Sequence, residues 1–128
     1  MNFCTKEHVT SYNLAISIGW NPKDIKVSYK GIRVRFKSKP YNHTSHYSYY
    51  WREFNYLDSN TIYNIAEVYD CFPSAIVEGN YFKAANNNKP TILEWECLLW
   101  SYQKNKWTRT TSINPKEAIA LAIINRDT

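Results

Sequence analysis

Histidines, paired glutamates and cysteines are the residues of this sequence whose types could support catalysis or metal binding. His43 and His46 are three residues apart, a spacing that directs both toward one metal ion only on a helix. Their segment follows Pro40 and is polar, and residues 38–50 contain no cysteine or carboxylate that could complete a ligand set. We therefore expect a loop with no metal site.

The glutamates and cysteines also fall short of a catalytic pattern. Glu94 and Glu96 lie two apart on one face of an expected strand and could act as general acid and base, although a solvated strand face explains them more simply. Cys71 is expected after a helix C-terminus, where the dipole does not favour a thiolate, and Cys97 is expected on an apolar strand face. The three glycines form no phosphate-binding loop. The sequence predicts no enzyme and no cofactor.

Charge and composition indicate a binding protein. The 128 residues carry 16 Lys and Arg against 11 Asp and Glu, a formal charge of +5 that favours anionic partners. Eleven Tyr and five Trp exceed the usual need of a core of this size, and such residues are typical of recognition surfaces. The three cysteines are far apart and outside any CxxC pair, and no long apolar run is present. We expect a single domain, residues 1–128, in the cytoplasm, with no membrane partner.

The cations have their clearest pattern in an expected β-hairpin over residues 24–39. Apolar side chains alternate with basic ones on either side of a turn expected at Lys30-Gly31, which would set Val27 opposite Val34 and Lys26 opposite Arg35. The expected apolar face contains Ile25, Val27, Tyr29, Ile32, Val34 and Phe36. Like charges that lie opposite each other destabilise a hairpin, so the pattern favours a bound anion that would offset their repulsion.

An aromatic segment follows the hairpin. Residues 40–56 are rich in Tyr, and Tyr47, Tyr49 and Trp51 share one face if the chain is extended, so the segment is expected to start as a loop and end as a third strand. Aromatic stacking combined with positive charge is a common way to bind nucleotides, and the segment beside the basic hairpin could serve this purpose. An ordinary edge strand with no ligand is an equal alternative for it. The candidate ligand-binding residues are Lys26, Arg33, Arg35, Lys37, Tyr47, Tyr49 and Trp51.

The remaining elements define an α+β domain of antiparallel hairpins and three helices. Capping residues and apolar periodicity predict helices over about 6–18, 59–70 and 115–125. Residues 75–77 and 81–84 are expected to form a short hairpin. Residues 91–102 alternate as a long strand does, with a helix as the alternative, and a turn at Lys104-Asn105 leads to a partner strand over residues 106–111.

The chain from residue 51 to 125 resembles the NinX-like group of small phage proteins. The resemblance lies in three features. The first is a polar segment that enters a helix, with Asn55, Tyr56, Leu57, Asp58, Ile62 and Ile65. The second is an extended segment with Trp95 and Trp100, and the third is a closing Asn-Pro-x-x-Ala-Ile helix with Asn114, Pro115, Ala118 and Ile119. The resemblance covers more than half of the chain and leaves out the basic hairpin. It implies a phage or prophage origin and no particular chemistry.

Three functions remain open. The first is a phage counter-defence protein that sequesters an anionic nucleotide immune signal, with a homo-oligomer as one way to build the pocket. The second is an anti-CRISPR-like inhibitor that contacts a host defence protein, since Tyr, Trp and Arg also anchor protein interfaces. The third is direct DNA or RNA binding on the sheet.

Overall fold

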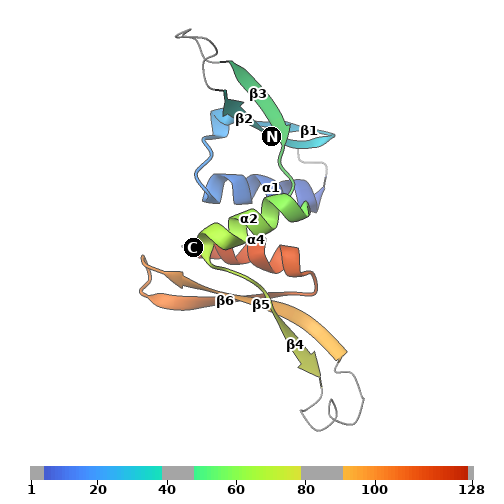
Figure 1. Ribbon diagram of the computed structural model, residues 1–128, viewed down its shortest axis with the longest axis vertical. Coiled ribbons are helices and arrows are strands. Elements are labelled where there is room, and N and C mark those ends of the chain that lie inside the picture. Colours follow the sequence, from blue (N-terminus) through green and yellow to red (C-terminus); the bar gives the residue numbers. More distant parts are fainter. Residues whose placement is uncertain (1–4, 39–47, 79–90, 127–128) are drawn as a thin grey trace.

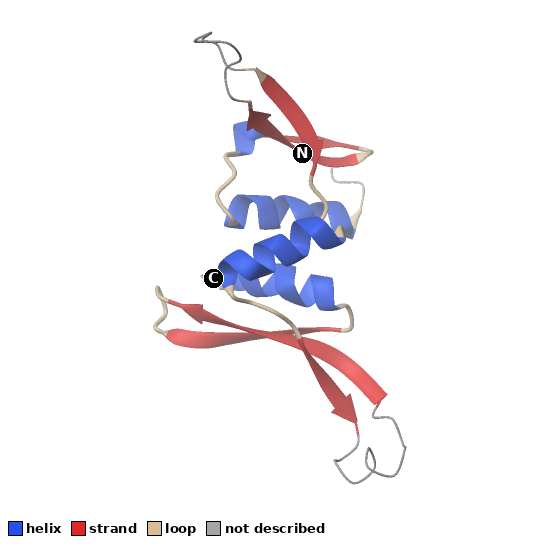
Figure 2. Cartoon of the chain, viewed as in Figure 1, coloured by secondary structure: helices blue, strands red, loops and turns tan. Residues whose placement is uncertain are grey.

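A computed structural model describes residues 5–38, 48–78 and 91–126. A layer of helices lies between two three-stranded antiparallel sheets, one at each end of the molecule (Figures 1 and 2). The α+β class is therefore confirmed. In chain order the elements are α1 (Lys6–Ser17), the 3-10 helix η1 (Pro22–Asp24), β1 (Ile25–Ser28), β2 (Gly31–Lys37), β3 (Tyr49–Glu53), α2 (Ser59–Tyr69), β4 (Ser74–Glu78), β5 (Thr91–Ser101), β6 (Lys106–Ser112) and α4 (Pro115–Asn125).

The three expected helices are present, and each begins where a polar side chain caps it. The Thr5 hydroxyl accepts from the His8 N–H at 3.2 Å, the Asp58 carboxylate accepts from the Thr61 N–H at 2.9 Å, and the Asn114 amide oxygen accepts from the Lys116 N–H at 2.9 Å. These bonds satisfy N–H groups that have no partner within the helix. Within the described ranges no helix is long and apolar enough to cross a membrane.

The N-terminal sheet has the order β1-β2-β3, and its hairpin register differs from the expected one. Val27 lies opposite Ile32, and Lys26 lies opposite Arg33. The turn is at Tyr29-Lys30, and Gly31 opens β2 with a φ of +131°, which residues other than glycine avoid. The partner of each β1 residue lies two positions earlier on β2 than expected, and this even shift keeps the paired residues on their expected faces. Tyr29 leaves the apolar face and is 76% exposed.

The C-terminal sheet has the order β4-β5-β6 and settles the alternative for residues 91–102. Thr91–Ser101 is a strand of 11 residues whose first half pairs with β4 and whose second half pairs with β6. Asn105, with a φ of +52°, lies in the expected turn. Residues 75–77 belong to β4, whereas residues 81–84, their expected hairpin partner, lie outside the described residues.

One hydrophobic core joins both sheets to the helix layer. Its fully buried members come from every layer and include Leu14 of α1, Ile32 of β2, Ile62 of α2, Cys97 of β5 and Ile119 of α4. Burial of such a side chain stabilises the fold by about 1.5–3 kcal/mol. Each sheet turns one side toward the helices, so the side chains that alternate with its core residues face outward.

Candidate functional site

The outward face of the N-terminal sheet brings the predicted cations and aromatic rings together. On β2 the outward residues are Arg33, Arg35 and Lys37, and the register places Glu53, Trp51 and Tyr49 of β3 beside them in that order. Lys26 of β1 lies opposite Arg33. We call this surface the basic face and define it as Lys26, Arg33, Arg35, Lys37, Tyr49 and Trp51. Tyr47, the remaining candidate, lies outside the described residues.

The opposite face of the same sheet anchors it to the core. Ile32 and Val34 are each 1% exposed, and Ile25 is also buried. These residues alternate with the cations along the strands, so packing of the apolar face fixes which way the cations point. The separation of the two faces that the sequence predicted is confirmed.

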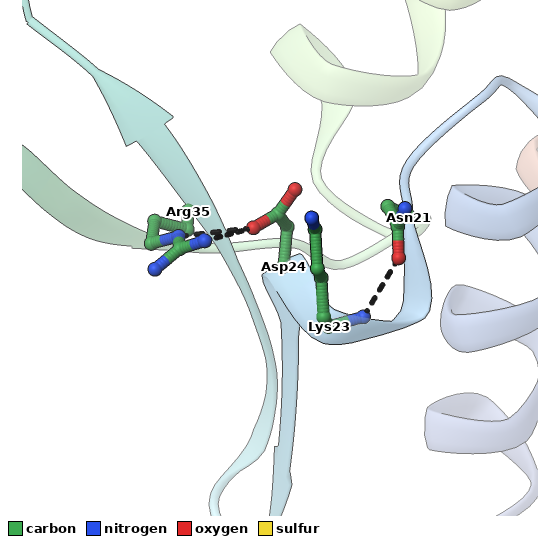
Figure 3. Close-up of polar contacts among 4 residues, drawn as sticks. All are labelled: Asn21, Lys23, Asp24 and Arg35. Carbon is green, nitrogen blue, oxygen red and sulfur yellow. Dashed lines mark hydrogen bonds and ion pairs between the residues drawn. The ribbon is translucent and has the colours of Figure 1, made fainter.

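Arg35 is held inside the protein's own network. Its Nε donates to Asp24 Oδ1 at 3.0 Å, and its Nη2 forms an ion pair with the same oxygen (Figure 3). Its guanidinium carbon lies 4.7 Å from the ring centroid of Tyr49 and 5.9 Å from that of Trp51. Two aromatic rings and one carboxylate therefore restrain a side chain that is 33% exposed.

Asp24 was not among the predicted site residues, because it meets Arg35 only in the observed register. With the expected turn, Lys26 would lie opposite Arg35. The observed register, extended by one position, sets Asp24 beside Arg35 instead. Asp24 ends η1, whose start is capped by the side chain of Asn21, which accepts from the Lys23 N–H at 3.1 Å (Figure 3). The position of Asp24, an acid directly before the first strand, was the sequence signal that could have predicted this ion pair.

Trp51 is also in contact with a cation from β1, on the far side of β2. Lys26 Nζ lies 4.4 Å from the centroid of the Trp51 ring. Trp51 is half-buried while Tyr49 is 56% exposed, so both rings retain surface that a ligand can reach. Two cations of the basic face, Lys26 and Arg35, thus contact its rings, and the aromatic quadrupoles and Asp24 partly offset their positive charge.

A hollow of about 340 Å³ lies at the hairpin end of the basic face. Lys26 and Arg33 line it together with two turn residues that the sequence analysis did not select, Tyr29 and Lys30. Among the described residues no ion pair joins Arg33 to an acid, although Glu53 is its neighbour on β3. The hollow collects three cations, which suits a phosphate group better than a neutral ligand.

The residues considered for catalysis are placed elsewhere. Glu96 forms an ion pair with Arg109 on the outward face of the C-terminal sheet. Cys71 and Cys97 are buried against each other, with Cys97 Sγ 3.9 Å from the Cys71 carbonyl oxygen. The hydrogen bond with Cys71 and burial both raise the pKa of the Cys97 thiol. Such a thiol is a poor nucleophile.

The metal-site candidates are not part of the described structure. His43 and His46 lie outside it. Within residues 5–38, 48–78 and 91–126, no group of three or more His, Cys, Asp and Glu side chains is placed to hold a metal ion.

Comparison with known proteins adds no further constraint. No protein-family model, no curated protein and no solved structure matches this chain. The resemblance to the NinX-like phage proteins therefore stays a prediction.

Proposed function

We propose that the protein is a non-enzymatic binder of an anionic nucleotide and that the basic face is its binding surface. The observation that carries the proposal is the contact of Trp51 with Lys26 and of Arg35 with Tyr49 on one outward sheet face. A base can stack on an exposed ring while its phosphate meets a neighbouring cation. The geometry supports both interactions within one side of a three-stranded sheet.

The spacing along β2 supports the same proposal. Arg33 and Lys37 flank Arg35 on the same face, each about 7 Å away along the strand. Asp24 offsets the charge of Arg35, so Arg35 serves mainly to orient Tyr49 and Trp51. Lys26 and Arg33 line the hollow beside them, where a phosphate would be held.

The biological setting that we propose is phage counter-defence. The resemblance to small phage proteins supports a phage origin, and a protein that binds without turnover would act by sequestering a nucleotide signal of host immunity. Sequestration is stoichiometric, so protection would follow the ratio of protein to nucleotide. An anti-CRISPR-like inhibitor would use the same Trp, Tyr and Arg residues against a protein surface.

A second candidate ligand is a single strand of DNA or RNA. The supporting observation is that the basic face is an open sheet surface whose three β2 cations lie in a row. Sheets with exposed aromatic residues bind single strands by stacking successive bases. A single strand would extend along the row, whereas a nucleotide would occupy the hollow and one ring.

Calorimetric titration separates these ligands. We expect a mononucleotide or cyclic nucleotide to saturate at a fixed molar ratio, and inorganic phosphate to bind more weakly because it cannot stack. Tight binding of an oligonucleotide alone, with affinity that falls steeply as salt rises, would favour the second candidate. No binding of either ligand would refute the proposal.

A matched pair of variants tests the location of the site. Arg33→Gln/Lys37→Gln removes two positive charges from the basic face, and Lys104→Gln/Lys106→Gln removes two from the hairpin of the other sheet. Both lower the formal charge equally. Only the first is expected to weaken binding. Equal loss in both variants would mean that net charge, rather than this surface, attracts the ligand.

A further inference from the structure

A second concave region lies at the other end of the molecule. It is a cavity of about 380 Å³ between the end of α2, the end of α4 and the hairpin of β5 and β6. In Figure 1 the C-termini of α2 and α4 and the β5–β6 turn lie together on the left side of the view. Its lining includes Tyr69, Asp70, Trp100, Tyr102, Trp107 and Arg126.

Three of these rings form a corner, which we call the aromatic corner and define as Trp100, Tyr102 and Trp107. The Trp107 ring is inclined by 73° to the Trp100 ring with centroids 5.5 Å apart, and the Tyr102 ring is inclined by 83° with centroids 6.5 Å apart. Trp107 is 63% exposed and Tyr102 is 90% exposed. Trp100 and Trp107 are opposite each other in the β5–β6 register, so their contact also stabilises the sheet. The exposure of Trp107 and Tyr102 nevertheless leaves ring surface that a ligand can reach.

The charges around the cavity favour a cation over an anion. Asp70 lines it and also ends α2, whose last turn has no basic residue, so the carboxylate and the partial negative charge of the helix C-terminus coincide. Arg126 lies over the Tyr69 ring at 5.3 Å, which shows that a ring lining this cavity accepts a cation. Arg126 lines the cavity as well, and the C-terminal carbonyl groups of α2 add partial negative charge beside Asp70.

We propose that the aromatic corner binds a quaternary or methylated ammonium group. Such a group is weakly hydrated, carries a diffuse positive charge and is attracted to the faces of Trp and Tyr rings. A corner of inclined rings offers it more than one ring face, and Asp70 supplies the compensating charge. This site is separate from the basic face and does not depend on the function proposed for it.

Choline and its neutral carbon analogue, 3,3-dimethylbutan-1-ol, test the proposal because they have nearly the same shape and differ in charge. We expect choline to shift the indole N–H signals of Trp100 and Trp107 in two-dimensional NMR spectra and to saturate, and the alcohol to have little effect. Equal binding of the alcohol would identify a simple apolar pocket and overturn the proposal. Absence of choline binding would overturn it as well.

Variants of exposed residues locate the site without threatening the fold. Tyr102→Ala and Trp107→Ala are each expected to weaken choline binding about three- to tenfold. Asp70→Asn removes only the charge, because asparagine also tolerates the φ of +51°. This variant is expected to bind choline more weakly than the wild type at low salt, and the difference in affinity should shrink at high salt, where the charge of Asp70 is screened. Trp51→Ala removes a ring from the other sheet and is the control. Unchanged affinity in the first three variants would contradict the proposal.

Discussion

Arg35 and Asp24 form an ion pair across the N-terminal hairpin, and this pair gives Arg35 a role different from that of Arg33 two residues earlier on the same strand. Asp24 holds Arg35 between the Tyr49 and Trp51 rings. Arg33 instead lines the hollow at the hairpin end. The basic face therefore combines a cation that positions the rings with cations that can meet a ligand.

Arg35→Gln is expected to destabilise the protein more than Arg33→Gln. The Arg35 ion pair is partly exposed and screened by solvent, so its loss should cost about 0.5–1 kcal/mol, whereas Arg33→Gln should change the free energy of unfolding by less than about 0.5 kcal/mol. Urea unfolding measures both. Adding Asp24→Asn to Arg35→Gln should cost little more, and additive losses in this double-mutant cycle would show that the two residues do not stabilise the fold through each other.

Trp51→Ala should weaken nucleotide binding by about 1–3 kcal/mol if a base stacks on the ring. Tyr49→Ala should act in the same direction. Both residues face outward, so thermal unfolding should show that the variants fold normally. A loss of affinity measured by titration calorimetry can then be attributed to the missing ring. Ligand recovered unchanged at a fixed molar ratio is expected from a sequestering protein. Destruction of excess nucleotide by a small amount of protein would instead reveal an enzyme.

Asp58 should make the stability of α2 depend on acid pH. The Thr61 hydroxyl and backbone N–H both donate to its carboxylate, and these bonds hold the pKa of Asp58 below its ordinary value. A depressed folded-state pKa gives stability that is present above the unfolded pKa and is lost as the pH falls through the folded one.

Asp58→Asn is the matched variant, because asparagine caps a helix comparably without titrating. The stability difference between the wild type and this variant is expected to shrink as the pH falls below the ordinary carboxyl range. Urea midpoints at a series of pH values measure it. A difference that stays constant with pH would show that the charge of Asp58 does not contribute.

The thiols of Cys71 and Cys97 should be protected in the native state. Both are buried, which blocks access of a reagent to either sulfur. The pKa of the Cys97 thiol is raised, so its thiolate is scarce, whereas the hydrogen bond with Cys97 lowers the pKa of the Cys71 thiol, whose protection therefore depends on burial. In a Cys4→Ser background, mass spectrometry after iodoacetamide treatment should find no alkylation until urea unfolds the protein. Reductant should leave the melting temperature unchanged. Rapid alkylation of the folded protein would show that this part of the core opens readily.

Local patterns in the sequence determined the elements. Thr5, Asp58 and Asn114 marked where the helices begin, because a short polar side chain is needed there to satisfy free N–H groups. Strict alternation over residues 24–37 predicted the two faces of the hairpin, since successive side chains of a strand point in opposite directions. These inferences depend only on neighbours along the chain.

Tertiary structure decided which residues meet. The register differs from the expected one by two positions along β2, so Asp24 instead of Lys26 is the neighbour of Arg35, while the paired residues keep their faces. Pairing of residues 91–101 with strands on both sides fixed that segment as a strand, which alternation alone had left open. The cavity beside the aromatic corner brings the β5–β6 hairpin together with the ends of α2 and α4. Contacts between segments so distant in sequence arise only from packing around a shared core, and local periodicity does not encode them.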